Sequence, residues 1–81
     1  MDKIFTLTRD NISAELVDVD EESLGQSLTF SRGTVLTIIR PAHAWGNVKG
    51  VQYCTVQIGG KYFNILALVL QESVAPKPKR S

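Results

Sequence analysis

The clearest hydrophobic pattern lies between Val51 and Leu70, where two β-prone runs flank a pair of glycines. Gly59 and Gly60 can both take positive φ, which a type I′ turn demands, so the pattern predicts a β-hairpin. Counting outward from the turn assigns to the core face the pairs Ile58–Lys61, Val56–Phe63, Cys54–Ile65 and Gln52–Ala67. The outer face receives the pairs Gln57–Tyr62, Thr55–Asn64, Tyr53–Leu66 and Val51–Leu68. Because a shift of one residue would mix the two sets, this register is self-consistent.

The end of this hairpin, from Ile65 to Leu70, is apolar on both faces. It predicts either a strand that is buried on both sides or a strand that is broken by one 3₁₀ turn. The run is too short to cross a bilayer, which takes about 20 apolar residues. We therefore expect no membrane partner.

A second alternation of apolar and polar residues runs from Lys3 to Arg9, as is typical of a strand. Asp10 and Asn11 follow, and both tolerate the left-handed backbone conformation, so they predict the turn of a second hairpin. That hairpin would pair Leu7 with Ala14 and Phe5 with Leu16. The alternative is a short helix that begins with Asn11 as its N-cap.

Composition and length indicate one small folded domain. The chain has 81 residues, of which 43% are hydrophobic and 21% charged. A domain of this size has a thin core and little room for a deep substrate cleft. We expect residues 1–73 to form the domain, and residues 74–81, with prolines and bases, to form a mobile tail. The start of the chain lacks the pattern of a secretory signal, and Cys54 is the only cysteine, so we expect a cytoplasmic protein.

Charge is distributed unevenly along the chain. Residues 1–22 hold seven acids and two bases, whereas residues 23–81 hold seven bases and one acid. The acids concentrate between Asp18 and Gly25, which predicts a solvated acidic loop. This loop does not follow the EF-hand pattern, because Ser23 stands where that pattern needs glycine and Thr29 where it needs glutamate.

Apolar residues alternate around a glycine between Ser27 and Ile39. The positions that carry this pattern are Leu28, Phe30, Gly33, Leu36 and Ile38. They resemble the diverging turn and the following strand of Src-homology-3 domains. The resemblance implies an all-β fold, a small five-stranded and mostly antiparallel barrel, with the Gly59–Gly60 hairpin as the distal hairpin and a 3₁₀ turn within Leu66–Leu70.

The same resemblance bears on ligand binding. Trp45 would match the tryptophan of the family's groove. The positions of the groove tyrosines and proline are held by Val17, Val19, Asn64 and Leu68. The chain therefore departs from the family's pattern for binding proline-rich ligands.

Few residues could carry out chemistry. Beyond hydroxyl groups, the candidate nucleophile and base are Cys54 and His43, and the hairpin register turns Cys54 inward, where a thiol is unreactive. One histidine and one cysteine fall short of a zinc site, and no phosphate-binding or dinucleotide-binding motif is present. We therefore expect no enzyme activity, no metal, no cofactor and no small-molecule substrate.

The sequence favours a non-enzymatic module that binds a protein partner or a second copy of itself. Trp45 lies in the irregular stretch Arg40–Gly50 and is either a contact residue or a core residue, and tryptophan and arginine are enriched in binding hot spots. The candidate partner-binding residues are Arg40, His43, Trp45, Lys49, Tyr53, Tyr62, Leu66 and Leu68. The alternative is nucleic-acid binding by the basic half of the chain, with the candidates Arg32, Arg40, Lys49, Lys61, Lys77, Lys79 and Arg80.

Overall fold

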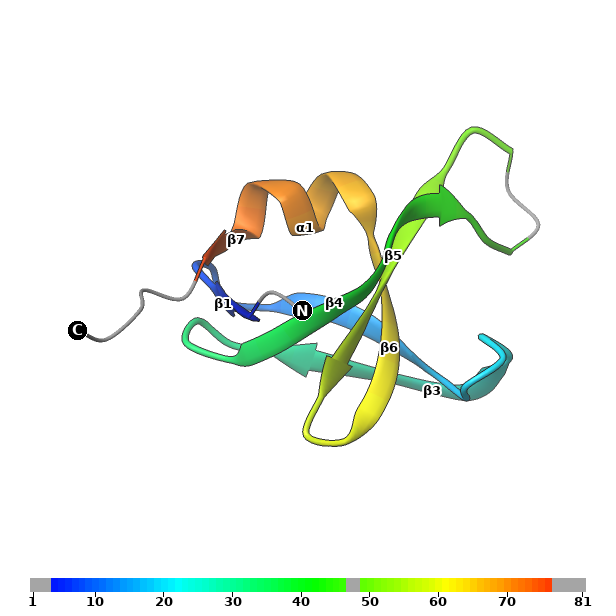
Figure 1. Ribbon diagram of the computed structural model, residues 1–81, viewed down its shortest axis with the longest axis horizontal. Helices are drawn as coiled ribbons and strands as arrows, with labels where there is room; N and C mark the ends of the chain where they lie inside the picture. The colour runs from blue at the N-terminus through cyan, green and yellow to red at the C-terminus, as the bar shows by residue number, and fades with distance from the viewer. Residues whose placement is uncertain (1–3, 47–48, 77–81) are drawn as a thin grey trace.

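The computed structural model describes residues 4–46 and 49–76 (Figure 1). Its elements are β1 (Ile4–Leu7), β2 (Ile12–Val17), β3 (Ser23–Phe30), β4 (Val35–Ala44), β5 (Gln52–Ile58), β6 (Lys61–Leu66), α1 (Ala67–Ser73) and β7 (Val74–Pro76). The strands form one antiparallel sheet in the order β3-β2-β6-β5-β4-β1-β7. The predicted all-β class is confirmed.

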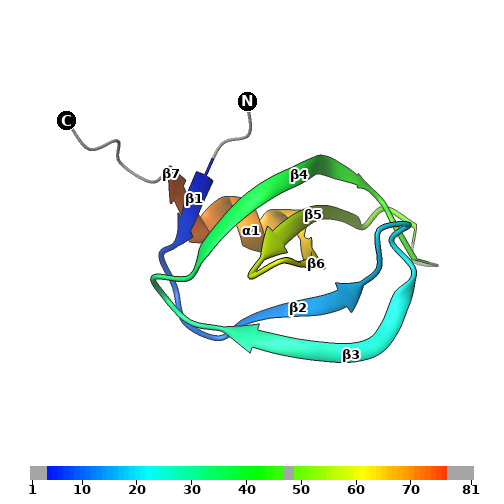
Figure 2. The ribbon, with the colours of Figure 1, turned by 60° about the horizontal axis from the view of Figure 1, so that its bottom comes forward.

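The predicted five-stranded barrel is wrong. The described sheet has seven strands and curves strongly, but β3 and β7 remain its two ends (Figure 2). β7 has only three residues and includes Pro76, which has no backbone N–H to donate. β7 therefore has few backbone groups that could form hydrogen bonds to β3 and close the sheet into a barrel.

The predicted Gly59–Gly60 hairpin is confirmed. Both glycines have positive φ, 60° and 83°, as a type I′ turn requires. All six pairs from Ile58–Lys61 to Tyr53–Leu66 form in the expected register. Cys54, Val56 and the residues opposite them are buried, so the predicted core face is confirmed for these two pairs. Lys61 and Gln52, which were assigned to the same face, are exposed.

The expectation of a continuing strand or a 3₁₀ turn after Ile65 is wrong, because the chain turns into the helix α1. The expected pairs Gln52–Ala67 and Val51–Leu68 therefore do not form. Ala67, Leu70 and Ser73 are the buried residues of α1, and their spacing of three is a helical repeat. Because every residue of Ile65–Leu70 is apolar, the hydrophobic pattern of the sequence does not distinguish this helical repeat from a strand.

The predicted N-terminal hairpin is also wrong. β1 pairs with β4 and β7, whereas β2 pairs with β3 and β6. Phe5 lies opposite Leu36 and not opposite Leu16. The alternative helix does not form either, because Ile12–Val17 is a strand. Asn11 does adopt a left-handed conformation, with φ of 62°, but it joins two strands that pair elsewhere.

The pattern around Gly33 folds locally as expected. Leu36 is buried, Ile38 packs against the core, and Gly33 has a φ of 93° in the turn between β3 and β4. Phe30 meets the buried ring of Phe63 edge to face, with ring centroids 5.0 Å apart.

The stretch Arg40–Gly50 is less irregular than expected, because β4 continues to Ala44. Its pairing with β5 shifts register on both sides of Arg40, next to Pro41, where the ladder lacks one donor. At the other end of the chain, Val74–Pro76 form β7 and belong to the sheet rather than to a tail. The expected tail residues Lys77, Lys79 and Arg80 lie outside the described residues. No helix among the described residues is long and apolar enough to span a membrane.

Candidate functional site: a buried carboxylate and an apolar groove

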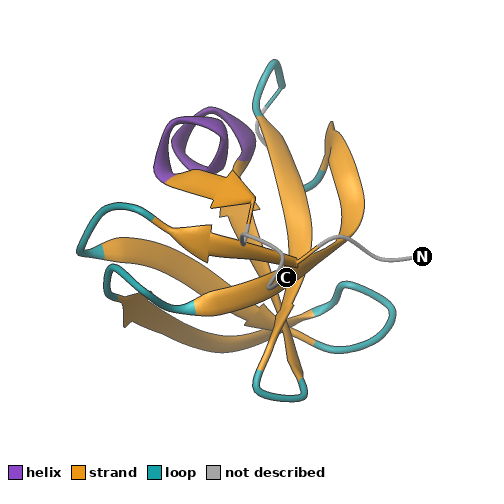
Figure 3. Cartoon of the chain, turned by 60° about the vertical axis from the view of Figure 1, so that its left-hand side comes forward, coloured by secondary structure: helices purple, strands orange, loops and turns teal. Residues whose placement is uncertain are grey.

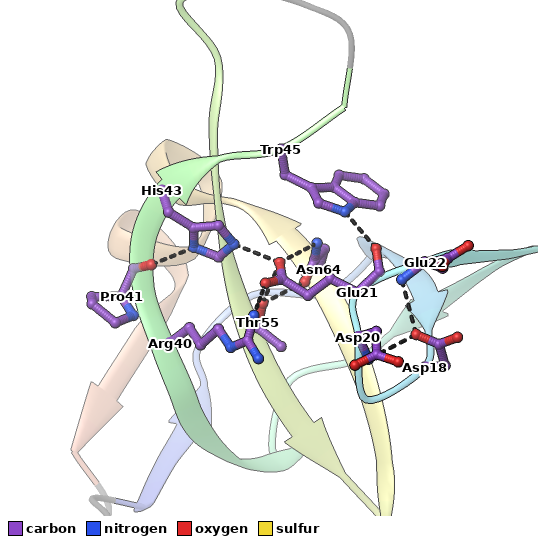
Figure 4. Close-up of polar contacts among 10 residues, drawn as sticks. All are labelled: Asp18, Asp20, Glu21, Glu22, Arg40, Pro41, His43, Trp45, Thr55 and Asn64. Atoms are coloured by element: carbon purple, nitrogen blue, oxygen red, sulfur yellow. Dashed lines mark hydrogen bonds and ion pairs between the residues drawn. The ribbon is translucent and has the colours of Figure 1, made fainter.

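A tight acidic loop joins β2 to β3. The Asp18 carboxylate accepts backbone N–H groups from Asp20 and Glu22, at 2.8 and 3.0 Å, which closes the loop on itself. Between them, Glu21 has a φ of 64°, a conformation that costs a residue other than glycine about 1–2 kcal/mol. The loop thereby turns the Glu21 side chain back over the sheet (Figure 4).

The Glu21 carboxylate is the centre of a polar cluster. Its Oε1 accepts from His43 Nε2 at 2.6 Å and from the Asn64 amide at 3.2 Å. The single hydroxyl proton of Thr55 lies between Asn64 Oδ1, at 2.7 Å, and Glu21 Oε1, at 3.1 Å. The other carboxylate oxygen pairs with Arg40. The cluster therefore ties the loop to β4, β5 and β6.

The backbone of Glu21 makes one more contact. Its carbonyl accepts the indole N–H of Trp45 at 2.7 Å, and the Trp45 ring packs edge to face on Tyr53 with centroids 5.0 Å apart. Trp45 is partly buried by these contacts. It is thus not one of the buried core residues, and its role as a contact residue stays a prediction.

The prediction of a solvated acidic loop is wrong for Glu21, whose side chain is only 11% exposed. The loop covers part of the predicted outer face of the β5–β6 hairpin. Thr55 and Asn64 on that face are buried, and their polar groups find partners in each other and in Glu21.

Both ring nitrogens of His43 are occupied. Nδ1 lies 2.7 Å from the Pro41 carbonyl, and Nε2 lies 2.6 Å from Glu21. Since both partners are acceptors, the geometry fits the doubly protonated imidazolium. The Pro41 carbonyl raises the pKa of His43, and the Glu21 carboxylate raises it further, against the opposing effects of burial and Arg40.

The pKa of Glu21 moves the other way. Burial raises this pKa, but the hydrogen bonds from His43, Asn64 and Thr55 outweigh burial and lower it below its ordinary value.

We expect folding stability to depend on pH through this pair. The pKa of His43 is raised from 6.5, so its contribution is complete below pH 6.5 and is lost as pH rises through the folded-state pKa. The pKa of Glu21 is lowered from 4.5, so its contribution is complete above that pH and is lost on further acidification. The free energy of unfolding, measured with urea, should therefore be highest between about pH 4.5 and 6.5.

His43 is the only histidine, so the variant His43→Gln should lose the decline above pH 6.5. An unchanged alkaline decline in that variant would contradict the assignment.

These contacts define what the cluster can do chemically. The Glu21 carboxylate and the His43 ring make all of their contacts within the protein. This arrangement holds the loop on the sheet and leaves neither group free to act as a base. Cys54 is buried, and burial raises the pKa of its thiol, which keeps it protonated and unreactive. Within residues 4–46 and 49–76, no group of three or more histidine, cysteine, aspartate or glutamate side chains could hold a metal.

A second feature is an apolar groove with a volume of about 440 Å³, lined by residues of α1 and of the start of β5. α1 is the helix drawn in Figure 3. We call the groove the α1 groove. It is lined by Gly50, Val51, Gln52, Leu66, Ala67, Leu68, Val69 and Gln71. None of these side chains is charged. The groove is therefore suited to an uncharged apolar ligand.

The structure divides the sequence-predicted partner residues between these two features. Arg40, His43, Trp45 and Tyr53 gather around the Glu21 loop, whereas Leu66 and Leu68 line the α1 groove. Lys49 is exposed in the turn before β5, and Tyr62 is half-buried near the Gly59–Gly60 turn. The α1 groove therefore retains the predicted residues with the most exposed apolar surface.

The basic candidates for nucleic-acid binding are spread over the fold. Arg32 lies in the turn between β3 and β4, Lys61 begins β6, and Arg40 is paired with Glu21. The residues that sequence reasoning missed include Glu21, Thr55 and Asn64 in the polar cluster and Val51 and Val69 in the α1 groove. No hydrophobic pattern in the sequence marked Val69 as exposed, because the run Ile65–Leu70 is apolar throughout.

Comparison of the chain with protein-family models, curated proteins and solved structures finds no match. The resemblance to Src-homology-3 domains stays a prediction.

Proposed function

We propose that the chain is a non-enzymatic binding module that takes an apolar segment of a protein partner in the α1 groove. The observation that carries this proposal is the exposure of Leu68, which is 75% accessible on the outer side of α1. Leu66 and Val69, also exposed, lie beside it along the same groove.

A short helix on a small domain ordinarily places polar residues on its outer side. α1 instead buries Ala67 and Leu70 and keeps Leu68 and Val69 in solvent. Single exposed apolar residues are common, but a contiguous set beside a hollow is typical of an interaction site. Because the lining carries no charge, we infer a ligand segment that contributes leucine-like or aromatic side chains rather than a charged peptide.

Two observations support a non-enzymatic role. Both nitrogens of the His43 imidazole form hydrogen bonds within the protein, so this ring is not available as a general base. The thiol of Cys54 faces the core, away from any substrate.

The experiment places a photo-crosslinking amino acid at Gln71, an exposed residue of the groove, in the cells that make the protein. We expect protein adducts that Leu68→Asp abolishes, since truncating a hot-spot contact often costs about 2 kcal/mol of binding. Leu68→Asp should leave the free energy of unfolding within about 0.5 kcal/mol of the parent, because this side chain is exposed.

Val19→Asp is the matched control, since Val19 is also an exposed apolar residue but lies outside the groove. This variant should keep the adducts. Adducts that consist of nucleic acid, or protein adducts that survive Leu68→Asp, would contradict the proposal.

A further inference from the structure

β3 is an edge strand of the sheet. β3 pairs with β2 on one side, and no strand of the described chain pairs with its other side. Seven of its eight residues are exposed. About half of the backbone N–H and C=O groups of an edge strand point away from its one neighbour, so β3 presents unpaired donors and acceptors.

β3 lacks the charged residues and prolines by which proteins often block strand association. Its sequence, SLGQSLTF, contains no charged residue and no proline. The opposite edge is protected, because β7 is only three residues long and includes Pro76. The contrast between the two edges indicates that β3 is the side on which an additional strand can pair.

The shape of β3 defines which part can pair. Gly25 has a φ of 74°, and the pairing of β3 with β2 shifts register between Ser23 and Ser27. Figure 2 shows that β3 is bent along its length. The segment Gln26–Phe30 follows Gly25, and its middle residue is Leu28. An antiparallel pair of two such segments, related by a two-fold axis, would therefore have its axis at Leu28.

We propose that β3 pairs antiparallel with β3 of a second copy of this chain, with Leu28 at the two-fold axis. Self-pairing brings no like charges together, because the segment is uncharged. It also places Leu28 against the partner's Leu28. Leu28 lies opposite buried Ala14 and is still 37% exposed, so the second copy would cover apolar surface that β2 leaves in solvent.

In this register Ser27 lies directly opposite the partner's Thr29, twice in each dimer. Both residues are exposed and lie on the same face of β3. Their substitution can therefore change the interface without disturbing the core. The α1 groove contains no residue of β3, so the dimer and the proposed partner binding are independent.

The first experiment measures the dimer dissociation constant by sedimentation equilibrium. We expect the parent to dimerise reversibly with concentration. Ser27→Lys with Thr29→Lys places two like-charge pairs across the axis and should raise the dissociation constant by about tenfold or more. The matched control, Ser27→Lys with Thr29→Glu, places opposite charges at the same positions and should retain dimerisation.

The second experiment tests the register with cysteines, since the native Cys54 is buried. We expect Ser27→Cys and Thr29→Cys, each made alone, to crosslink slowly, and an equal mixture of the two to crosslink rapidly. Only in the mixture would the two thiols be directly opposite, at a distance that a disulfide can bridge.

Three results would overturn the proposal. One is a parent that stays monomeric up to the highest soluble concentration. Another is a dimer that the lysine pair leaves intact and that Leu68→Asp abolishes, which would place the interface at the α1 groove. The third is a single-cysteine variant that crosslinks faster than the mixture, which would show a different register.

Discussion

Replacing Glu21 with alanine is expected to lower the free energy of unfolding by about 3 kcal/mol. The substitution leaves Arg40 and His43 without their shared carboxylate. It also removes the acceptor of the Asn64 amide, which belongs to a buried residue. Urea denaturation at pH 6 would measure the loss.

Three variants separate the parts of this effect. Glu21→Gln keeps an acceptor oxygen but removes the charge, so it should fall between the parent and alanine. Glu21→Gly should be about 1 kcal/mol less harmful than alanine, because glycine tolerates the positive φ at this position. Asp20→Ala, in the same loop but exposed, should change stability by less than about 0.5 kcal/mol. If Glu21→Ala were as mild as Asp20→Ala, the cluster would not hold the loop.

The role of Glu21 could not be inferred from the sequence. It is one of eight acidic residues, and its neighbours Asp20 and Glu22 are exposed, as expected of a solvated loop. What distinguishes it is a left-handed backbone, which no local rule assigns to glutamate. An indirect signal was present: Thr55 and Asn64 form a polar pair between the apolar pairs Cys54–Ile65 and Val56–Phe63. When such a polar pair is buried by another segment of the chain, that segment must supply a hydrogen-bond partner.

Local patterns predicted the structure at two turns that join neighbouring strands, although they missed the helix α1. The β5–β6 hairpin is correct in every observed pair because the Gly59–Gly60 turn determines its register. The turn at Gly33 and the buried Leu36 follow for the same reason.

Prediction failed where pairing is between distant segments. β1 alternates as a strand should, but its partners are β4 and β7, which lie far along the chain. Alternation identifies a strand and its buried face without identifying its neighbour. A plausible turn at Asp10 and Asn11 therefore suggested the wrong partner.

The candidate site was predicted in part for the same reason. Leu66 was assigned to the outer face by alternation, and it is exposed in the α1 groove. Leu68 was assigned to that face as a strand residue, and it is exposed for another reason, because α1 turns it outward. Trp45 was recognised as unusual, but its hydrogen bond to Glu21 depends on a loop 24 residues earlier.

Replacing both turn glycines with valine is expected to lower the free energy of unfolding by about 2–4 kcal/mol. A Cβ at Gly59 or Gly60 would meet no other atom within 4 Å, so the cost does not come from a clash. It comes from the φ values of 60° and 83°, which a β-branched residue avoids. Thermal and urea unfolding of the double variant would measure it.

Gly59→Asn provides the control for this interpretation. Asparagine followed by glycine suits a type I′ turn, and asparagine has fewer unfolded conformations than glycine. This variant should therefore be as stable as the parent or slightly more stable, although it also adds a side chain at the turn. If asparagine and the two valines destabilised the protein equally, the loss would stem from the added side chains, and the left-handed conformation of the turn would not be what selects glycine. A loss confined to the valine variant would instead show that the left-handed backbone of this turn is what selects glycine. This turn joins β5 to β6 in the register that places Thr55 and Asn64 beneath Glu21.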